Sequence, residues 1–454
     1  MTPILLKGGR LIDPASGLDG PFDLLLSDGI VQAVEAPGAL DSARDAQVVD
    51  ALRYWVVPGL IDPHVHLRDP GFPEKETIPT GLRAAAAGGF TTVAAMANTL
   101  PVNDTPEIAR YMLGRARETR ATRLIPVCAV TRGLDGAELV DYEAMAEAGA
   151  RLFSDDGIPI DDQAVLARAL EEVNRRGFVI SLHEEDRAIS PSGAINAGET
   201  ADLLGLRGIP GDAESIRVRR DLALAIGSEA AVHVAHVSTA QSLDLIRAAR
   251  KRGAIVTCEV TPHHFALDER AVLESGPNAK MSPPLRNHQE QAAIIAAMAD
   301  GTIDMIATDH APHDPASKEM ERLAGFFGPG IKAGRLPEEQ ACALTRAAKG
   351  VVGLETALGL AMGLVHRSVI SATRMVEMMS LKPAGLLRLK AGTLAPGAAA
   401  DVTVIDPQRA WKVDPARFLS KSRNTPFAGM ELRGRAILTI VGGLIVYDGR
   451  SGAV

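Results

Sequence analysis

Short apolar runs alternate with turn-forming residues at the beginning of the chain, a pattern that predicts β-strands. Gly8-Gly9 and Asp28-Gly29 supply turn signals within this region. We expect antiparallel strands around the apolar runs at residues 4–6, 24–26, 48–49 and 55–57.

From Gly59 onwards, apolar runs alternate with segments of helical periodicity. Residues 163–176 and 239–252 show apolar side chains three to four positions apart, and Gly177 and Gly253 close these two segments. Eight β/α units in this order predict a (β/α)8 TIM-type barrel. The eight expected strands are Leu60–Leu67, Phe90–Met96, Leu124–Val130, Ala150–Phe153, Phe178–Leu182, Ala231–Val237, Ile255–Val260 and Ile303–Thr308.

The strand and turn pattern returns after residue 380, in residues 400–407 and 437–449. We expect the two chain ends to form one smaller domain, a composite β-sandwich beside the barrel. The predicted fold class is therefore α/β, with residues 1–56 and 381–454 in the sandwich and residues 57–380 in the catalytic barrel.

Composition narrows the classes of function. The chain has 454 residues, 46% hydrophobic and 23% charged, which is typical of a folded soluble protein. Its net charge is −8, and the absence of a long Lys or Arg run argues against a nucleic-acid or membrane-surface partner. Three widely spaced cysteines without a Cys-x-x-Cys pair, and no apolar segment of membrane-spanning length, favour a cytoplasmic protein.

Histidines and carboxylates recur at the carboxyl ends of the expected barrel strands. His64 and His66 end the first strand, and residues i and i+2 of a strand point to the same side. His183 and His236 follow the fifth and sixth strands, and Asp309 follows the eighth. Active sites of TIM barrels lie at this end, so these side chains predict a metal site.

The fourth strand ends in a pair of aspartates, Asp155 and Asp156, and strand parity alone leaves open which of them points inward. Together with one of them, the four imidazoles and Asp309 suffice for two adjacent divalent ions. The pair His263 and His264, at the end of the seventh strand, is assigned to structural support. No ligand role is given to any of the remaining histidines, which are His233, His263, His264, His288, His310 and His366.

Along essentially its whole length, the chain resembles the class I dihydroorotases of the amidohydrolase superfamily. The resemblance rests on the motifs Asp-Pro-His-Val-His-Leu-Arg-Asp-Pro-Gly at 62–71, Lys-Glu-Thr at 75–77, Gly-Gly-Phe-Thr-Thr-Val-Ala-Ala-Met-Ala-Asn-Thr at 88–99, Phe-Ser-Asp-Asp-Gly at 153–157, Thr-Asp-His-Ala-Pro-His at 308–313, Gly-Leu-Glu-Thr at 353–356 and Ser-Lys-Ser-Arg-Asn-Thr-Pro-Phe at 420–427.

The resemblance implies the roles of the metal-site residues. The family spacing to His183, 27 residues, matches Asp156 as the bridging carboxylate, where related hydantoinases use a carboxylated lysine. One ion is implied at His64, His66 and Asp309, and the second at His183 and His236. A metal-bridged hydroxide then reacts with the substrate, with Asp309 as general acid and base. Two zinc ions per subunit are implied, and manganese or cobalt suits the same ligands.

The resemblance also implies a grip on the substrate carboxylate by Arg68, Asn98 and His313. Ser282 stands where the family has asparagine before Pro-Pro-Leu-Arg, and it still offers a hydroxyl. The family segment that caps the substrate corresponds either to residues 348–350, which include Gly350, or to residues 327–328. The long segment 314–349 is either a lid or a partner surface.

The activity implied is dihydroorotase, the reversible cyclisation of N-carbamoyl-L-aspartate to L-dihydroorotate in pyrimidine biosynthesis. Two alternatives are a non-catalytic scaffold for aspartate transcarbamoylase, which would have lost metal ligands, and another cyclic-amide hydrolase such as an allantoinase or hydantoinase. A homodimer and a complex of the active enzyme with aspartate transcarbamoylase are both compatible with the sequence.

Overall fold

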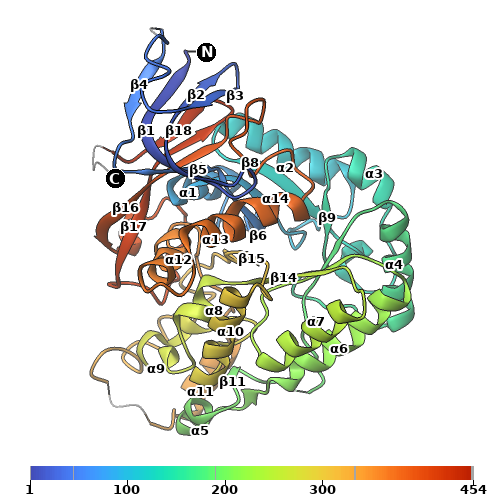
Figure 1. The fold of residues 1–454 in the computed structure, drawn as a ribbon. Coiled ribbons are helices and arrows are strands. Elements are labelled where there is room, and N and C mark those ends of the chain that lie inside the picture. The colour runs from blue at the N-terminus through green and yellow to red at the C-terminus, as the bar shows by residue number, and fades with distance from the viewer. Residues whose placement is uncertain (1, 44, 190, 332–333, 451–454) are drawn as a thin grey trace.

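A parallel barrel forms the body of the molecule (Figure 1). The structure, a computed structural model, describes residues 2–43, 45–189, 191–331 and 334–450. All eight predicted barrel strands are confirmed, each of them shorter than expected. They are β6 (Leu60–Val65), β7 (Phe90–Ala95), β8 (Arg123–Cys128), β9 (Leu152–Phe153), β10 (Ile180–Leu182), β13 (Val232–Val234), β14 (Val256–Val260) and β15 (Met305–Ile306).

The barrel strands follow one another in chain order from β6 to β15. A parallel bridge between Val65 and His310 closes the ring, and the His66 amide donates to the His310 carbonyl oxygen at 2.8 Å. Closure therefore brings the segment after the last strand beside the end of the first strand. The predicted ligand Asp309 thus comes close to the predicted ligands His64 and His66.

Helices surround the barrel, and several begin at a side chain that caps the first turn. The Asp162 carboxylate accepts the amides of Ala164 and Val165, and the Thr239 hydroxyl accepts that of Ser242. Each such cap contributes about 1 kcal/mol. The helices of eight residues or more are α1 (Ile78–Gly88), α2 (Pro106–Thr119), α4 (Gln163–Arg175), α6 (Asp212–Gly227), α7 (Ala240–Lys251), α10 (His288–Asp300), α11 (Glu338–Arg346) and α12 (Ala357–His366).

Shorter elements lie in the connections. They are the helices α3 (Tyr142–Glu147), α5 (Glu199–Leu204), α8 (Pro262–Ala266), α9 (Ala271–Ser275), α13 (Ala372–Val376) and α14 (Lys382–Leu386), and the paired strands β11 (Ile195–Asn196) and β12 (Gly208–Ile209). Most of this material follows β10 and β14, at the carboxyl ends of the barrel strands, where it surrounds the entrance to the barrel.

The two chain ends together form a second sheet, as predicted. In the order β18-β17-β16-β5-β1-β2-β3, with β4 also paired to β1, it joins strands from opposite ends of the sequence. The strands are β1 (Ile4–Asp13), β2 (Leu18–Ser27), β3 (Ile30–Glu35), β4 (Gln47–Asp50), β5 (Trp55–Pro58), β16 (Val402–Lys412), β17 (Glu431–Val441) and β18 (Leu444–Asp448). The predicted boundaries at 56/57 and 380/381 remain a prediction.

One detail of the N-terminal prediction is wrong, because β4 and β5 run parallel to β1 rather than antiparallel. The strands β3 and β4 both run in the direction of β1, and β5 takes its antiparallel partner from the other chain end, β16. Apolar spacing marks each strand but carries no information about a partner some 350 residues away, so the direction of pairing was not accessible from local sequence.

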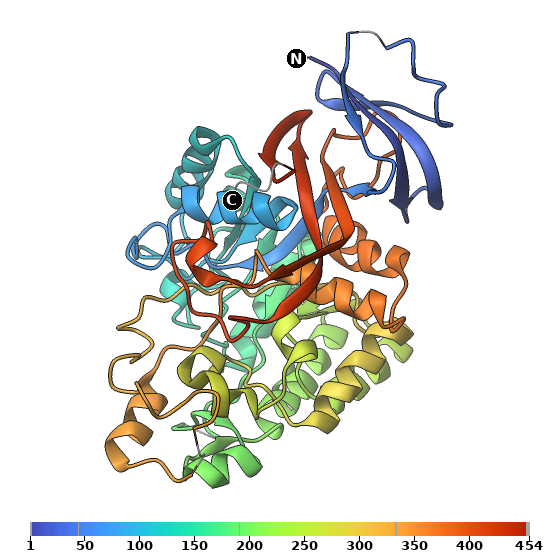
Figure 2. The same ribbon diagram turned by 90° about the vertical axis from the view of Figure 1, so that its left-hand side faces the viewer.

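The second sheet is attached to the barrel by packing and by buried hydrogen bonds. The Thr403 hydroxyl donates to the Gly89 carbonyl and the Thr439 hydroxyl donates to the Ala86 carbonyl, both at 2.6 Å. Figure 2 shows the C-terminal strands lying against the barrel and continuing towards the N-terminal strands. These hydrogen bonds reach α1 and the residue before β7, and β17 also packs against α12. The attachment through Gly89 is thus at the amino end of β7, whereas the predicted metal ligands lie at the carboxyl ends of the barrel strands.

Within the described ranges, no helix combines the length and apolarity needed to cross a bilayer.

Candidate metal centre and adjoining cavity

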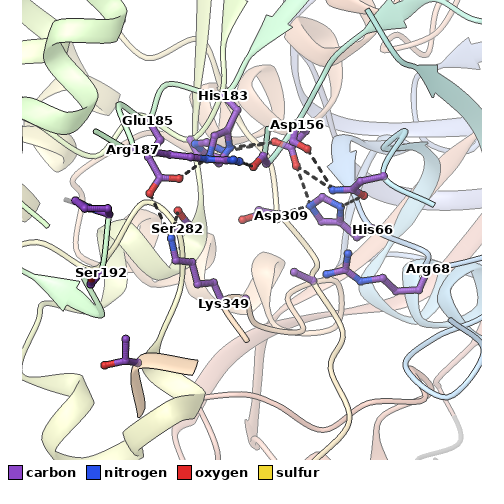
Figure 3. A pocket seen from close by; sticks show the side chains of 18 residues that line it. His66, Arg68, Asp156, His183, Glu185, Arg187, Ser192, Ser282, Asp309 and Lys349 are labelled. Atoms are coloured by element: carbon purple, nitrogen blue, oxygen red, sulfur yellow. Dashed lines mark hydrogen bonds and ion pairs between the residues drawn. The ribbon is translucent and has the colours of Figure 1, made fainter. Parts of the chain in front are cut away.

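Six predicted ligand residues converge at the carboxyl ends of the barrel strands. Their side chains come from β6 and from the segments that directly follow β6, β9, β10, β13 and β15. Figure 3 labels His66, Asp156, His183 and Asp309 among them. All six are buried, with exposed fractions between 1% and 8%: His64, His66, Asp156, His183, His236 and Asp309.

Asp156 lies between two groups of possible ligand atoms. Its Oδ1 is 3.5 Å from His64 Nε2 and 3.3 Å from His183 Nδ1, while Oδ2 is 3.5 Å from His66 Nε2. One group contains His64, His66 and Asp156, and the other contains Asp156, His183 and His236. A carboxylate shared by two adjacent ligand groups can bridge two ions.

The protonation pattern of His64 tests whether these residues fit a cation. Its Nδ1 lies 2.7 Å from Glu259 Oε1 and therefore carries the proton of this hydrogen bond. Its buried Nε2 has no hydrogen-bond partner and faces the carboxylates of Asp156 and Asp309, each at 3.5 Å. A bare imidazole lone pair beside two carboxylates requires either an added proton or a metal ion, so the arrangement fits a divalent metal.

The electrostatics of the two aspartates agree with this interpretation. Burial by itself would raise the pKa of Asp156, but His64 and the hydrogen bonds from the neighbouring imidazoles hold it well below the usual range. Burial also opposes ionisation of Asp309, yet the hydrogen bond with His66 and the charge of His64 lower its pKa. Both carboxylates are therefore ionised and available as ligands near neutral pH.

The structure decides between the two adjacent aspartates at the end of β9. Asp155 accepts the amides of Val130 and Thr131 at 2.7 and 3.1 Å and the Thr131 hydroxyl at 2.5 Å, which directs it away from the histidines. Asp156 alone of the pair faces the ligand groups. Asp155 thus secures the strand end that holds Asp156 in place.

Polar residues behind the histidines fix the orientation of their rings. Glu259, on β14, contacts His64 Nδ1 and also lies 3.0 Å from His233 Nε2. Glu185 Oε2 is 3.5 Å from His183 Nε2. Carboxylates in this position fix the tautomer of a metal-binding histidine. Sequence reasoning missed both glutamates, although Glu259 lies in the predicted seventh strand, one residue from its carboxyl end.

Two residues of the metal cluster have left-handed backbone angles, which residues other than glycine rarely adopt. The φ angles are +31° at His236 and +45° at Asp309. Such conformations cost of order 1–3 kcal/mol and persist where the surrounding structure imposes them, often at functional sites. The barrel therefore holds these two side chains in the cluster at some cost in stability.

A cavity of about 420 Å³ opens beside the cluster, and the predicted substrate residues Arg68, Asn98, Ser282 and Gly350 line it. Arg68 donates to the Pro312 carbonyl at 3.3 Å, and within the described ranges no carboxylate lies at ion-pair distance from its guanidinium. Burial lowers the pKa of Arg68 to about 10, so the group still carries its charge. An uncompensated cation in this cavity favours an anionic ligand.

The other two members of the predicted grip occupy different positions. The Asn98 amide oxygen lies 2.9 Å from His66 Nδ1, so Asn98 orients a metal-site histidine as well as lining the cavity. His313 stands behind the wall, where its Nε2 lies 2.8 Å from the Lys349 carbonyl and 3.3 Å from Arg68 Nη2. Burial, followed by the charge of Arg68, lowers the pKa of His313 to about 2, so this imidazole is neutral.

Residues 349–350 form part of the cavity wall, whereas residues 327–328 do not line it. Lys349 Nζ lies 3.3 Å from Glu185 Oε1 and 3.3 Å from Ser282 Oγ, on the opposite side from Arg68 in the view of Figure 3. Gly350 has a φ of +129°, and a Cβ there would lie 2.5 Å from the Ala311 Cβ. A residue without a side chain is thus required at this contact.

The histidines that received no ligand role lie outside both ligand groups in the part of the chain that the structure describes. His310 contacts Glu76 at 3.4 Å and accepts the Gly353 amide, while His264 lies between the Thr261 hydroxyl and the Pro283 carbonyl. His263 packs against His264, with ring centroids 4.6 Å apart. These residues support the walls of the site.

Comparisons with known proteins identify relatives that match this chain along nearly its whole length. A family profile described as Dihydro-orotase-like matches residues 54–242. A dihydroorotase of Desulforapulum autotrophicum is 45% identical over 98% of this chain and 99% of the relative, and one of Anaeromyxobacter dehalogenans is 46% identical over 98% of both. Among solved structures, an L-hydantoinase (dihydropyrimidinase) from Arthrobacter aurescens superposes with a TM-score of 0.83 at 26% identity, covering 99% of this chain and 96% of its own.

Proposed function

The chain belongs to the dihydroorotase family, and from this premise we propose that it catalyses the reversible cyclisation of N-carbamoyl-L-aspartate to L-dihydroorotate. The observation that carries the proposal is the pairing of a buried histidine and carboxylate cluster with an uncompensated Arg68 in one cavity. The reaction needs both features, because its substrate presents a reacting amide or carboxyl group and a second carboxylate that does not react.

The metal ligands in this proposal are the six buried residues. His64, His66 and Asp309 would hold one ion, and His183 and His236 would hold the second, with Asp156 shared by the two groups. Zinc is the proposed metal, and manganese or cobalt would suit the same donors. When bound, such ions lower the pKa of water to roughly 7 and polarise the carbonyl group that is attacked.

Asp309 is the proposed proton carrier. Its ionised carboxylate, 3.0 Å from His66 Nε2, opens onto the cavity. During ring opening it accepts a proton from the attacking water and delivers it to the leaving ring nitrogen. During cyclisation the same carboxylate takes the proton from the ureido nitrogen and gives it to the reacting carboxylate oxygen, which departs as hydroxide, and a proton from solvent completes the water.

Arg68 is the proposed partner of the carboxylate that does not react. Its guanidinium can donate two parallel hydrogen bonds to a carboxylate, and desolvation by the cavity wall strengthens such a pair. The proposed substrate site is completed by Asn98, His313, Ser282 and Gly350. Asn98 holds His66 in position, and His313 holds Arg68 in position. The neutral state of His313 avoids placing a second positive charge against Arg68.

The alternative functions find less support in the described site. A non-catalytic scaffold would not need six buried ligand residues gathered within one cluster with strained backbone angles at two of them. A hydantoinase or allantoinase would act on a ring without the additional carboxylate, for which Arg68 would be an uncompensated charge.

The experiment is a set of ring-opening assays on the purified protein, with L-dihydroorotate, hydantoin and allantoin side by side and metal content measured on the same sample. We expect turnover of dihydroorotate alone, loss of activity with a chelator, and recovery on adding zinc. Turnover of hydantoin or allantoin in preference to dihydroorotate, or no turnover with the metal site filled, would contradict the proposal.

A further inference from the structure

A second cavity lies away from the catalytic site, at the strands that come from the C-terminal end of the chain. It measures about 650 Å³, larger than the catalytic cavity, and is bounded by the end of β16, the segment after it, Arg435 on β17, and Glu355 just before α12. None of the residues that line it belongs to the metal cluster or to the catalytic cavity. The proposed function leaves this cavity without a role.

Four cationic side chains surround this cavity: Arg409, Lys412, Arg417 and Arg435. Among the described residues, no carboxylate lies within ion-pair distance of any of them. Arg409 donates to the Gly449 carbonyl at 2.8 Å, and Arg435 stacks on the Trp411 ring at 4.9 Å. Such a concentration of unpaired cations is unexpected in a chain with a net charge of −8, where most arginines could find an acidic partner.

The two acidic residues of the cavity wall are already engaged by backbone amides. Asp414 accepts the Ala416 amide at 3.0 Å, and Glu355 accepts the amides of Leu419 and Ser420 at 2.9 to 3.1 Å. Burial raises the pKa of Glu355 to about 7, so part of its negative charge is absent at neutral pH. The electrostatic potential of the cavity is therefore dominated by the four cations.

We propose that this cavity binds a small polyanion that carries adjacent phosphate groups, of the class of nucleoside di- and triphosphates. Guanidinium groups form paired hydrogen bonds with phosphate oxygens, and four cations around one space suit several linked phosphates better than a single carboxylate. The volume lies within the range of small-molecule sites and exceeds what inorganic phosphate needs. Trp411 and Phe418 supply apolar wall for the remainder of such a ligand.

Binding is tested without reference to catalysis, so failure of this proposal and failure of the dihydroorotase proposal are distinguishable. The metal-loaded protein is titrated with ATP and with inorganic triphosphate, both as their magnesium complexes, by calorimetry at low and at physiological salt. Trp411 offers a second readout in a Trp55→Phe background, because the chain has only these two tryptophans. We expect saturable binding of one ATP per chain and a change in Trp411 fluorescence.

Variants locate the site. Arg417→Glu and Lys412→Glu should each weaken binding by about tenfold or more, as expected for loss of a charge-assisted contact and its replacement by repulsion. Arg219→Glu is the matched control, since Arg219 is exposed on α6, away from the cavity, and makes the same change in net charge. Arg68→Met should leave ATP affinity unchanged, which separates this cavity from the catalytic one.

The relative affinities for ATP and triphosphate identify which part of the ligand the cavity recognises. Tighter binding of ATP than of triphosphate supports a nucleotide, and equal binding supports a polyphosphate group as the recognised element. The proposal would be overturned by any of three results. These are equal effects of Arg417→Glu and Arg219→Glu on ATP binding, loss of ATP binding in Arg68→Met, and the absence of saturable binding. A hexaglutamate peptide that binds at Arg417 more tightly than triphosphate would also overturn it, because the cavity would then be a docking site for an acidic segment.

Discussion

The two sides of the catalytic cavity differ in how firmly their side chains are held. On the metal side, each histidine and carboxylate is buried, and Glu259, Asn98 and Glu185 each contact one of the rings. On the substrate side, Arg68 and Lys349 are partly exposed and project from loops, with few partners of their own. The metal-side residues are therefore held in position before the substrate binds, whereas the substrate-side residues keep hydrogen-bond donors available for it.

The difference follows from the charges that each side must handle. The two carboxylates of the cluster carry like charges and repel each other, and imidazoles or cations must compensate them at fixed positions, so a rigid surround keeps the side chains together. A substrate carboxylate brings its own charge and leaves again with each turnover, so its partners gain from being unpaired in the free enzyme. Substitutions on the two sides should therefore produce different kinetic signatures.

The largest effect is expected for Asp309→Asn on the metal side. Asparagine keeps the shape of the side chain but cannot carry the proton, so turnover should fall by about 10²–10⁴-fold. Rates of dihydroorotate ring opening and metal content are measured on the same preparation. Near-normal rates with metal bound would show that another group moves the proton.

The next effect is expected for Arg68→Met on the substrate side. Loss of a charge-assisted pair should weaken carbamoyl-aspartate binding by about 2–3 kcal/mol, seen as a raised KM with metal content unchanged. Arg187→Met serves as the control, because Arg187 also lines the cavity but already donates to the Gly157 carbonyl. If both variants had the same KM, Arg68 would not be the carboxylate partner.

A smaller effect, again on the metal side, is expected for Glu259→Gln. The amide keeps the size of the side chain but weakens the hold on His64, so metal affinity should fall by about 10–100-fold. Competition with a chelator measures this affinity directly, and excess metal should restore turnover. Glu214→Gln is the control, since the buried Glu214 carboxylate accepts the amides of Ser238 and Thr239 outside the cluster. Equal metal affinity in both variants would remove Glu259 from the support of His64.

The smallest effect is expected for Gly350→Ala on the substrate side. A methyl group at this left-handed residue meets Ala311, so stability should fall by about 1–3 kcal/mol, measured as a lowered midpoint of urea unfolding. Gly363→Ala, on α12 with open space around its Cβ, should leave stability equal or raise it. Equal midpoints for the two variants would mean that the wall at residues 349–350 yields readily, in contrast to the metal side.

Much of the fold was accessible from local patterns in the sequence. The eight barrel strands and their order follow from apolar runs that alternate with helical periodicity, because each element must bury one face whatever its neighbours are. The cap that Asp162 provides at the start of α4 is likewise a local feature, since capping involves only adjacent amides. The parallel pairing of β4 and β5 with β1 was not accessible, because apolar spacing within a strand carries no information about the direction of its partners.

The candidate site shows the same division. The sequence by itself determined which residue types gather at the carboxyl ends of the strands, because the fold places these ends at one opening and the motifs occur at each of them. Only the tertiary structure decided that Asp156 rather than Asp155 faces the cluster, that Glu259 supports His64, and that His313 stands behind Arg68. These are matters of side-chain direction and of contacts between distant segments, which periodicity along a single strand does not encode.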